Sequence, residues 1–307
     1  MNLFSDCYSK VKKDCFKYIR SQEISNEKFK NKEKMLKQFL IPLSFWINKK
    51  KIKGETLFVG LAGGQGSGKT TISTMILLIL KKYFKMKVFK ISIDDFYKTR
   101  EERIKMSKKI HPMLKTRGVP GTHDVNLILK FFKNIEKIKF KKFSLPKFDK
   151  SIDDRCKKKL WYQVKDKPDI VILEGWCIGA RASKKYELKK PLNVLEANLD
   201  KNKKWRNFVN LQLNKSYKKL FSQLNLLIYL KAKNFRILKE WRLKQEKKLR
   251  IKFRKNKRSK IMSKEEVLKF MMTYQRITEQ MFKSCPKYCS AVLFLNNKQQ
   301  IQNLKMN

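Results

Sequence analysis

Eight consecutive residues, at positions 63–70, form a pattern that binds phosphate in many proteins. They read Gly-Gly-Gln-Gly-Ser-Gly-Lys-Thr and fill the template G-x-x-x-x-G-K-[ST]. The glycines allow backbone N–H groups to curl around a polyphosphate, and the N-terminus of a following helix adds partial positive charge. Lys69 would reach the β- and γ-phosphates, and the Thr70 hydroxyl would hold Mg²⁺. The expected chemistry is therefore the binding of ATP with a magnesium ion.

The sequence on either side of this loop supports the same interpretation. Residues 56–62 form a short apolar run typical of a buried parallel strand, and residues 71–82 predict a helix. A chance glycine turn is the alternative, and the order strand, loop, helix argues against it. The residues expected to bind ATP are Gly63, Gly64, Gln65, Gly66, Ser67, Gly68, Lys69, Thr70 and Thr71.

Three acidic residues follow predicted strands and could act on the bound nucleotide. Asp94 and Asp95 follow an alternating segment at 87–93, and Glu174 ends an apolar segment that begins at 169. Ligands of open α/β sheets bind at the carboxyl ends of the strands. An acid near Mg²⁺ and a carboxylate that accepts the proton of a substrate hydroxyl are both expected in a kinase. An acid after a strand can also be a helix N-cap, but three around one phosphate loop favour chemistry.

The segment 235–250 predicts a basic helix whose role has three interpretations. It could be a solvated charged face, a nucleic-acid-binding patch, or a lid whose arginines close over a transferring phosphate. Residues 263–266, Ser-Lys-Glu-Glu, fit a capping box, and the apolar stripe after them predicts a core-facing helix. Of the two histidines, His111 precedes Pro112 and is interpreted as structural. His123 lies in a glycine-rich loop, and both a structural and a substrate-binding role stay open.

The elements that must position these residues alternate between strand and helix. Helical segments separate most of the strands, which predicts a doubly wound parallel sheet with helices on both faces. Residues 1–53 read as a helical extension, and 54–307 as the kinase domain with a lid segment near 235–260. The strands are expected at 56–62, 87–93, 169–175, 224–230 and 291–295.

The formal net charge of +50 over 307 residues is the outlier of the composition. Such a charge can indicate binding to nucleic acid or to an anionic membrane. The excess is mostly lysine spread along the whole chain, which favours compositional drift on solvated faces, so we expect no specific nucleic-acid partner. No apolar run approaches the roughly 18 residues of a membrane helix, and the N-terminus has no secretory signal pattern. Scattered cysteines without a zinc pattern suit a reducing cytoplasm.

Several separated segments together resemble one known family. They lie at 63–71, 92–97 (Ser-Ile-Asp-Asp-Phe-Tyr), 117–124 (Arg-Gly-Val-Pro-Gly-Thr-His-Asp), 145–151 (Leu-Pro-Lys-Phe-Asp-Lys-Ser) and 173–181 (Leu-Glu-Gly-Trp-Cys-Ile-Gly-Ala-Arg), with weaker likeness at 241–246 and 262–267. Over residues 54 to about 295 the chain resembles the D-glycerate 3-kinase group of P-loop kinases, related to uridine kinase, phosphoribulokinase and bacterial pantothenate kinase. The pair Trp176-Cys177 resembles the bacterial branch of that group.

The resemblance implies a role for each matched position. It points to Asp94 rather than Asp95 as the catalytic base, to Glu174 beside Mg²⁺, and to Arg242 and Arg250 as lid arginines. With Lys69, the expected catalytic residues are thus Asp94, Glu174 and Arg242, and Mg²⁺ would lie between Thr70 and Glu174. The residues that the resemblance places at the acceptor are Asp95, Tyr97, Arg117, His123, Asp124, Lys147, Asp149 and Arg181.

The function expected from these features is ATP-dependent phosphorylation of a small molecule. The resemblance implies D-glycerate as the acceptor and 3-phosphoglycerate as the product. A uridine or pantothenate type of kinase is the alternative within the class. A nucleic-acid-binding NTPase is the alternative from outside it, motivated by the charge. A GTPase is disfavoured because no Asn-Lys-x-Asp motif occurs.

Overall fold

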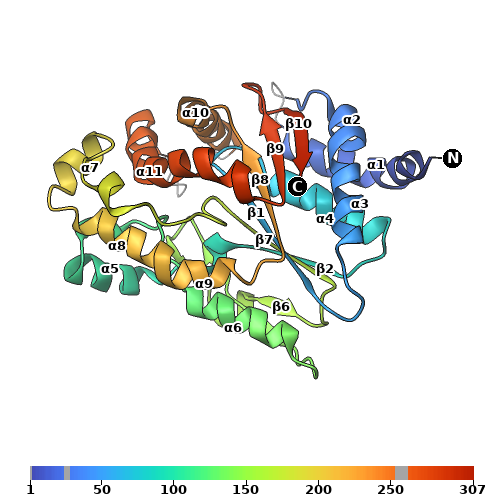
Figure 1. Ribbon diagram of the computed structural model, residues 1–307, viewed down its shortest axis with the longest axis horizontal. Coiled ribbons are helices and arrows are strands. Elements are labelled where there is room, and N and C mark those ends of the chain that lie inside the picture. The colour runs from blue at the N-terminus through green and yellow to red at the C-terminus, as the bar shows by residue number, and fades with distance from the viewer. Residues whose placement is uncertain (1, 24–27, 253–261) are drawn as a thin grey trace.

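A computed structural model describes residues 2–23, 28–252 and 262–307 of the chain (Figure 1). Its centre is a six-stranded sheet in the order β10-β9-β8-β1-β7-β2. The strands are β1 (Leu57–Gly63), β2 (Val88–Ser92), β7 (Ile170–Gly175), β8 (Leu226–Lys231), β9 (Ala291–Leu295) and β10 (Ile301–Met306).

All neighbouring strands of this sheet are parallel except β9 and β10. The predicted doubly wound parallel sheet is confirmed, and one strand was not predicted. β10 escaped prediction because only its first residue is buried and its side chains alternate poorly. It adds to the edge by a short antiparallel turn, which needs no crossover helix. The register places Leu61, Glu174 and Ser92 side by side, so the carboxyl ends of β1, β7 and β2 meet at one edge.

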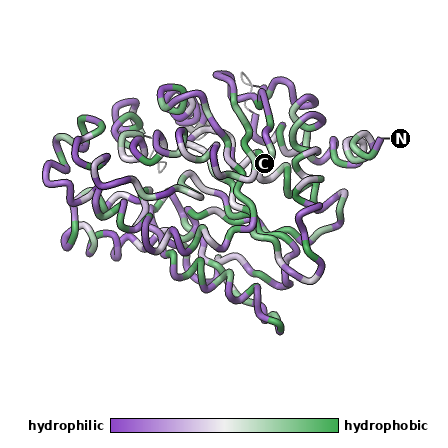
Figure 2. The backbone as a smooth tube through the Cα atoms, viewed as in Figure 1, coloured by the Kyte–Doolittle hydropathy of each residue, from purple (hydrophilic) through white to green (hydrophobic). Residues whose placement is uncertain are grey.

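The central strands β1 and β7 are buried on both faces because their apolar side chains contribute to two cores. In β1, Val59 and Leu61 belong to one hydrophobic cluster, whereas Phe58 and Ala62 belong to the other. This alternation follows from the period of two along a strand. The middle of the molecule is accordingly hydrophobic along the strands, and polar residues dominate the outer turns (Figure 2).

Helices cover both faces of the sheet (Figure 1). The α-helices are α1 (Leu3–Gln22), α2 (Lys32–Lys34), α3 (Ile41–Lys49), α4 (Lys69–Lys82), α5 (Arg100–Lys109), α6 (Val125–Glu136), α7 (Val194–Leu199), α8 (Lys204–Gln212), α9 (Lys218–Phe221), α10 (Phe235–Lys252) and α11 (Lys264–Tyr288). The 3₁₀ turns are η2 (Ile93–Phe96), η3 (Pro112–Lys115), η4 (Lys158–Leu160) and η5 (Lys185–Leu188), and the π-helical segments are η1 (Met35–Leu40) and η6 (Leu213–Tyr217).

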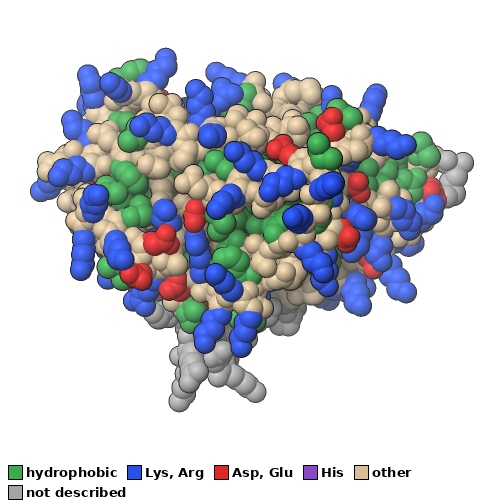
Figure 3. Space-filling view, turned by 90° about the horizontal axis from the view of Figure 1, so that it is seen from below, with side chains coloured by type: hydrophobic (Ala, Val, Ile, Leu, Met, Phe, Trp, Pro, Cys, Tyr) green, Lys and Arg blue, Asp and Glu red, His purple; other side chains and the backbone are tan. Residues whose placement is uncertain are grey.

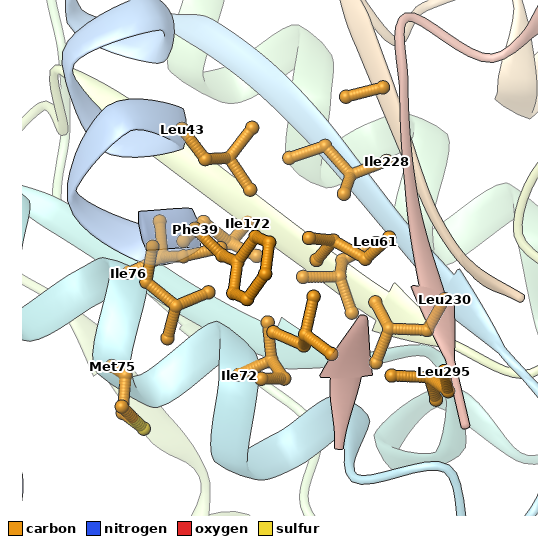
Figure 4. Packing of buried hydrophobic residues seen from close by; sticks show 14 of the residues in the cluster. Phe39, Leu43, Leu61, Ile72, Met75, Ile76, Ile172, Ile228, Leu230 and Leu295 are labelled. Atoms are coloured by element: carbon orange, nitrogen blue, oxygen red, sulfur yellow. The ribbon is translucent and has the colours of Figure 1, made fainter. Parts of the chain in front are cut away.

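The N-terminal helices pack on the same core as the phosphate loop. Val11, Cys15 and Ile19 of α1 are fully buried in the cluster that also contains β1 and α4. Phe39 and Leu43 point toward side chains of the sheet in the close view of this core (Figure 4). The helical character predicted for residues 1–53 is therefore present in the described part of that segment. The boundary after residue 53 stays a prediction.

Two small antiparallel pairs occupy the segment between α6 and β7. β3 (Phe143–Leu145) pairs with β6 (Tyr162–Val164), and β4 (Phe148–Asp149) pairs with β5 (Asp154–Arg155). The sequence did not predict these four strands, because strands of two or three residues show no periodicity. The β4–β5 pair packs against η2 and so reaches the end of β2.

The capping box predicted at the start of α11 is present. The Ser263 hydroxyl accepts from the N–H of Glu266, and the Glu266 carboxylate accepts from the N–H of Ser263. Of the lid segment predicted near 235–260, residues 235–252 form α10 and residues 253–260 lie outside the described part of the chain. Among the helices that the structure describes, none is long and apolar enough to cross a membrane.

Candidate active site

The phosphate loop connects the end of β1 to the start of α4 and lies against α10. Gly68 is the N-cap of α4 with φ +86°, and Gly66 has φ +77°. A Cβ on Gly66 would lie 3.0 Å from the backbone carbon of Trp241 and 3.2 Å from the backbone nitrogen of Arg242. Both its backbone conformation and this close approach favour glycine. The loop is thus shaped by its own sequence and by the helix above it.

A turn between β9 and β10 also holds the phosphate loop. Gln299 donates to the Gly66 carbonyl at 2.6 Å, and the Trp241 indole donates to the Asn297 carbonyl at 3.0 Å. Neither Gln299 nor Asn297 was predicted from the sequence, because both lie in a polar turn at the sheet edge far along the chain. Two groups of the loop, the Gln65 Oε1 and the Ser67 hydroxyl, are buried with no hydrogen-bond partner among the described residues.

Lys69 begins α4 and folds back over the loop. Its ammonium donates to the Gly64 carbonyl at 2.9 Å. Burial lowers the pKa of Lys69 to about 8, although the charges of Glu174 and Asp94 oppose that shift. A cation so placed is poorly solvated, and an anionic phosphate would restore its stabilisation.

Glu174 lies at the end of β7 and faces the first turn of α4. Its carboxylate accepts from the Thr70 hydroxyl at 2.9 Å and from the Ser73 hydroxyl at 2.5 Å, and the side chain is nearly fully buried. Thr70 and Glu174 are therefore adjacent, as the sequence predicted for a shared magnesium ligand set. Ser73, one helical turn further, was not predicted because serine in a helix carries no specific signal.

Asp94 lies in η2, directly after β2, and pairs with a lysine that the sequence did not single out. Lys150 places its ammonium 2.6 Å from the Asp94 carboxylate. Burial would raise the pKa of Asp94, but the charge and hydrogen bond of Lys150 outweigh burial and hold that pKa well below its usual range. Lys150 belongs to the turn between β4 and β5, which packs against η2. Tertiary packing, and not a local motif, therefore brings Lys150 to Asp94.

Asp95, the neighbour of Asp94, is held differently. Its Oδ1 accepts from the backbone N–H of Phe148 at 3.3 Å and from the Tyr162 hydroxyl at 3.5 Å. Burial raises the pKa of Asp95 to about 6, and the nearby charge of Asp94 contributes in the same direction. Asp95 therefore links η2 to β4 by a hydrogen bond, whereas Asp94 forms an ion pair with Lys150.

Tyr97 and His123 form a buried stack at the same edge. Their ring centroids are 4.3 Å apart, and their backbones form an isolated β-bridge. The Nδ1 atom of His123 lies 2.6 Å from the hydroxyl of Tyr217, and its Nε2 is buried without a partner among the described residues. His111, in contrast, caps η3 and contacts the carbonyl of Leu199, as expected of a structural histidine.

Arg117 reaches the β4–β5 turn. It pairs with Asp153 and lies over the Phe148 ring, 5.5 Å from its centroid. The fully buried Arg103 also pairs with Asp153 and donates to the carbonyls of Lys98 and Lys115. Asp153 therefore joins two arginines and holds the 117 loop against the turn that carries Lys150.

Two other predicted acceptor residues, both acids, have partners of their own. Asp124 is the N-cap of α6 and pairs with Arg155 at 3.2 Å. Asp149 accepts from the N–H and hydroxyl of Ser151. These acids are used by local structure, and the structure does not bring them to Asp94.

Lys147 and Arg181 lie further from this cluster of contacts. Lys147 is exposed, with its ammonium 5.9 Å from the Tyr162 ring centroid. The guanidinium of Arg181 lies 3.6 Å from the Tyr288 ring centroid and lines a small cavity between α8 and α11. No contact of Arg181 with Asp94 or the phosphate loop is present among the described residues.

Arg242 extends from the turn of α10 that touches the phosphate loop. It pairs with Glu246 at 2.6 Å and lies 5.9 Å from the Phe270 ring centroid. Arg250 donates to the carbonyl of Met262 at 3.2 Å. Of the two expected lid arginines, Arg242 is therefore the one whose backbone borders the loop.

The residues present fit a nucleoside triphosphate and Mg²⁺. The glycine loop around Gly66 can hold phosphates with its backbone, and Lys69 supplies an adjacent cation. The Thr70 and Glu174 oxygens are of the kind that Mg²⁺ prefers. One carboxylate and one hydroxyl suit Mg²⁺, which usually keeps several waters and takes the rest of its ligands from phosphates.

The parallel sheet, the glycine loop at the end of β1 and the acids at the ends of β2 and β7 define a P-loop kinase. No family model matches the chain. An uncharacterized kinase of Schizosaccharomyces pombe is 30% identical over 246 residues, which are 76% of this chain and 83% of the relative. The chloroplastic D-glycerate 3-kinase of Arabidopsis thaliana is 33% identical over 131 residues, 40% of this chain and 28% of the relative.

The solved structure of a D-glycerate 3-kinase from Cryptococcus neoformans shares the fold. Its TM-score is 0.69 at 22% identity, and the match covers 88% of this chain and 97% of that one. With the similarity to the fission yeast kinase, the chain belongs to the D-glycerate 3-kinase family of P-loop kinases. It is an ATP-dependent small-molecule kinase.

Proposed function

We propose that this kinase transfers the γ-phosphate of ATP to D-glycerate and forms 3-phosphoglycerate. The observation that carries the proposal is the Asp94–Lys150 pair beside Lys69, because it sets a base and a cation at the end of β2. An acid acceptor needs both: a carboxylate for its hydroxyl and positive charge for its own carboxylate. The name of the Arabidopsis relative supports the same acceptor.

The nucleotide side of the reaction falls to the phosphate loop. The backbone N–H groups of residues 63–71 would bind the phosphates, and Lys69 would lie against the transferring group. Mg²⁺, held by Thr70 and Glu174, would supply neutralisation of the phosphate charge. Arg242 would act from α10 as a lid arginine, since its backbone already borders Gly66.

Asp94 is the proposed base. It would accept the proton of the acceptor hydroxyl as that oxygen bonds to the γ-phosphorus, while the bond to the β–γ bridging oxygen breaks and ADP leaves. Asp94 is ionised at neutral pH because Lys150 holds its pKa low. Asp95 is a weaker candidate, because its Oδ1 already accepts from Phe148.

The aromatic rings near the acceptor favour an acid over a nucleoside. A nucleoside calls for a ring on which its base can stack. Phe148 and Trp176 are both almost fully buried: Arg117 covers Phe148, and Trp176 packs on Tyr274 and donates to the Gly118 carbonyl. Arg117 and Lys150 offer charge to a carboxylate instead.

The basic surface supports the small-molecule proposal more than a nucleic-acid one. Lysine and arginine side chains are scattered over the face in Figure 3 and do not gather into one stripe. A protein that tracks a nucleic-acid backbone concentrates such charge along a groove. We propose that the charge confers no specific nucleic-acid binding.

An ADP-release assay across a panel of acceptors tests the proposed function. The panel contains D-glycerate, L-glycerate, uridine, cytidine and pantothenate, with the Lys69→Ala variant as a background control. We expect ADP release with D-glycerate, and 3-phosphoglycerate as the product identified by ³¹P NMR. Turnover of uridine or pantothenate without turnover of glycerate would keep the kinase and replace its acceptor.

A further inference from the structure

A chain of buried hydrogen bonds leads to His123 from a residue distant in sequence. The backbone N–H of Gly121 donates to the Tyr217 hydroxyl at 3.0 Å, and that hydroxyl lies 2.6 Å from Nδ1 of His123. Tyr217 closes η6 and is fully buried, and His123 is 2% exposed.

The direction of these hydrogen bonds fixes where the histidine carries its proton. The Gly121 N–H can only donate, so the Tyr217 oxygen accepts there and has one proton of its own to give. Nδ1 of His123 is its partner within the described residues, so Nδ1 accepts that proton. An Nδ1–H ring would leave the Tyr217 proton, as well as Nε2, unpaired among the described residues, so hydrogen-bond satisfaction favours the ring hydrogen on Nε2.

The Nε2–H group is left without a protein partner. It is buried and makes no hydrogen bond to any described residue. The face of the ring is covered by Tyr97, which directly follows the turn that carries Asp94. Burial lowers the pKa of His123 to about 4, and the charge of Asp94 acts on it in the opposite direction. The ring is thus a neutral donor at neutral pH, and an unpaired buried donor is costly unless a ligand satisfies it.

We propose that Tyr217 positions His123 as an Nε2–H donor to an oxygen of the acceptor substrate. This inference rests on the proposed function for the identity of the acceptor. It assigns Tyr217 a positioning role that acts through His123 and is specific to the acceptor. A buried N–H donor that is left without an oxygen partner is costly, so a compound that lacks this oxygen should bind less well.

Histidine NMR tests the tautomer without any assay of activity. The chain contains two histidines, so a ¹⁵N-histidine-labelled sample gives two ring signals, and His111→Asn identifies the one from His123. Two-bond ¹H–¹⁵N spectra at neutral pH should show His123 neutral with its hydrogen on Nε2. In Tyr217→Phe the same ring should become a mixture of tautomers. An Nδ1–H ring in the unmodified chain, or an unchanged ring in Tyr217→Phe, overturns the inference.

Steady-state kinetics tests the link to the acceptor, using whichever panel compound is phosphorylated. Tyr217→Phe should raise KM for the acceptor about three- to tenfold, the usual effect of one neutral hydrogen bond, with KM for ATP unchanged. His123→Phe should raise it at least as much, and His123→Gln, which keeps an N–H donor, should recover part of the loss. Tyr229→Phe removes an equally buried hydroxyl outside this chain of hydrogen bonds and should leave both KM values unchanged.

Failure of the proposed substrate can be distinguished from failure of the proposed role of Tyr217. If another acceptor is phosphorylated and glycerate is not, the proposed substrate is wrong. The tautomer of His123, and the effect of Tyr217→Phe on KM for that acceptor compared with KM for ATP, still decide the role of Tyr217. If Tyr217→Phe lowers kcat and raises both KM values together with a lower melting temperature, the residue is only structural and the inference fails.

Discussion

The phosphate end of the candidate site and its proposed acceptor end are assembled from different kinds of sequence. The phosphate end draws on residues 63–73, which are continuous, and on Glu174 of the adjacent strand. The acceptor end draws on residues 92–97, 117–124 and 147–155, which meet through side-chain pairs such as Lys150–Asp94 and Arg117–Asp153. A binding site formed by backbone groups changes little when neighbouring side chains are replaced. A site formed by side-chain ion pairs can be changed by a single substitution.

This difference bears on how the family could change its acceptor. At the phosphate end, glycine positions and helix geometry leave little freedom. At the acceptor end, Asp153 and Lys150 lie on a turn between two strands of only two residues each. Substitutions in this turn should change which acceptor binds without changing how the nucleotide binds. We therefore expect variants of the phosphate end to lower kcat for every acceptor, and variants of the acceptor end to act mainly on KM for one.

Replacing the base should have the largest effect. Asp94→Asn should lower kcat by roughly 10²–10⁴, the usual range for a general base, because the amide keeps the shape but accepts no proton. Stopped-flow or coupled ADP release measures it, and ATP affinity should change little. Asp95→Asn is the matched control and should lose less. If Asp95→Asn is the more damaging of the two, the proposed base is wrong by one residue.

Removing the phosphate-loop cation should come next. Lys69→Ala should lower kcat by about 10²–10³, because one preorganised charge on the transferring group is lost. The fold should be retained, since the Lys69 ammonium donates to a loop carbonyl and Lys69 belongs to neither hydrophobic cluster. Lys81→Ala, at the exposed far end of the same helix, is the control. Near-normal turnover of a folded Lys69→Ala protein would remove the phosphate loop from the proposed mechanism.

The sequence predicted the phosphate end better than the acceptor end for a physical reason. A loop that needs positive φ values and a helix N-terminus must use glycines at set spacing, so its function is visible in eight letters. Five strands of the central sheet were visible through apolar or alternating patterns, whereas β10 and the short strands β3 to β6 were not. Glu174 and the pair Asp94 and Asp95 were visible because they follow predicted strands at the edge where α/β sheets bind ligands, and the resemblance then pointed to Asp94.

The acceptor end was less visible because its arrangement depends on distant pairs. Nothing local distinguishes Lys150 from the many other lysines, and only the packing of β4 and β5 on η2 brings it to Asp94. Tyr217 and Gln299 contact the site from segments with no motif. Conversely, Asp124 and Asp149 lie in matching segments, yet a helix N-cap and a local turn use their carboxylates.

Arg117 tests whether an ion-paired residue of the acceptor end also binds substrate. Arg117→Gln should raise KM for the acid roughly 10- to 100-fold, the range for a charged hydrogen bond, and leave KM for ATP near normal. Asp153→Asn removes the partner and keeps Arg117, so it should raise the acid KM much less. Equal effects of the two variants would mean that Arg117 only holds the turn.

Lys150 allows a test by pH. As the proposed base, Asp94 would act only when deprotonated, and the charge of Lys150 keeps the pKa of Asp94 low against the opposing effect of burial. Lys150→Gln should therefore raise that pKa, so that the fall of kcat toward acid pH begins at a higher pH. Lys147→Gln, in the same segment, should leave this limb in place. An unmoved limb in Lys150→Gln would separate Lys150 from the base.

The smallest expected effect concerns the basic surface. Exposed lysines dispersed over several faces can bind nucleic acid only through counterion release, which weakens steeply with salt. We expect RNA and duplex DNA to bind weakly at low salt, to lose most of that binding near physiological salt, and to leave ATP hydrolysis unchanged. Filter binding and ADP release over a salt series measure both. Nucleic-acid-stimulated hydrolysis at physiological salt would contradict this expectation and favour a nucleic-acid-binding NTPase.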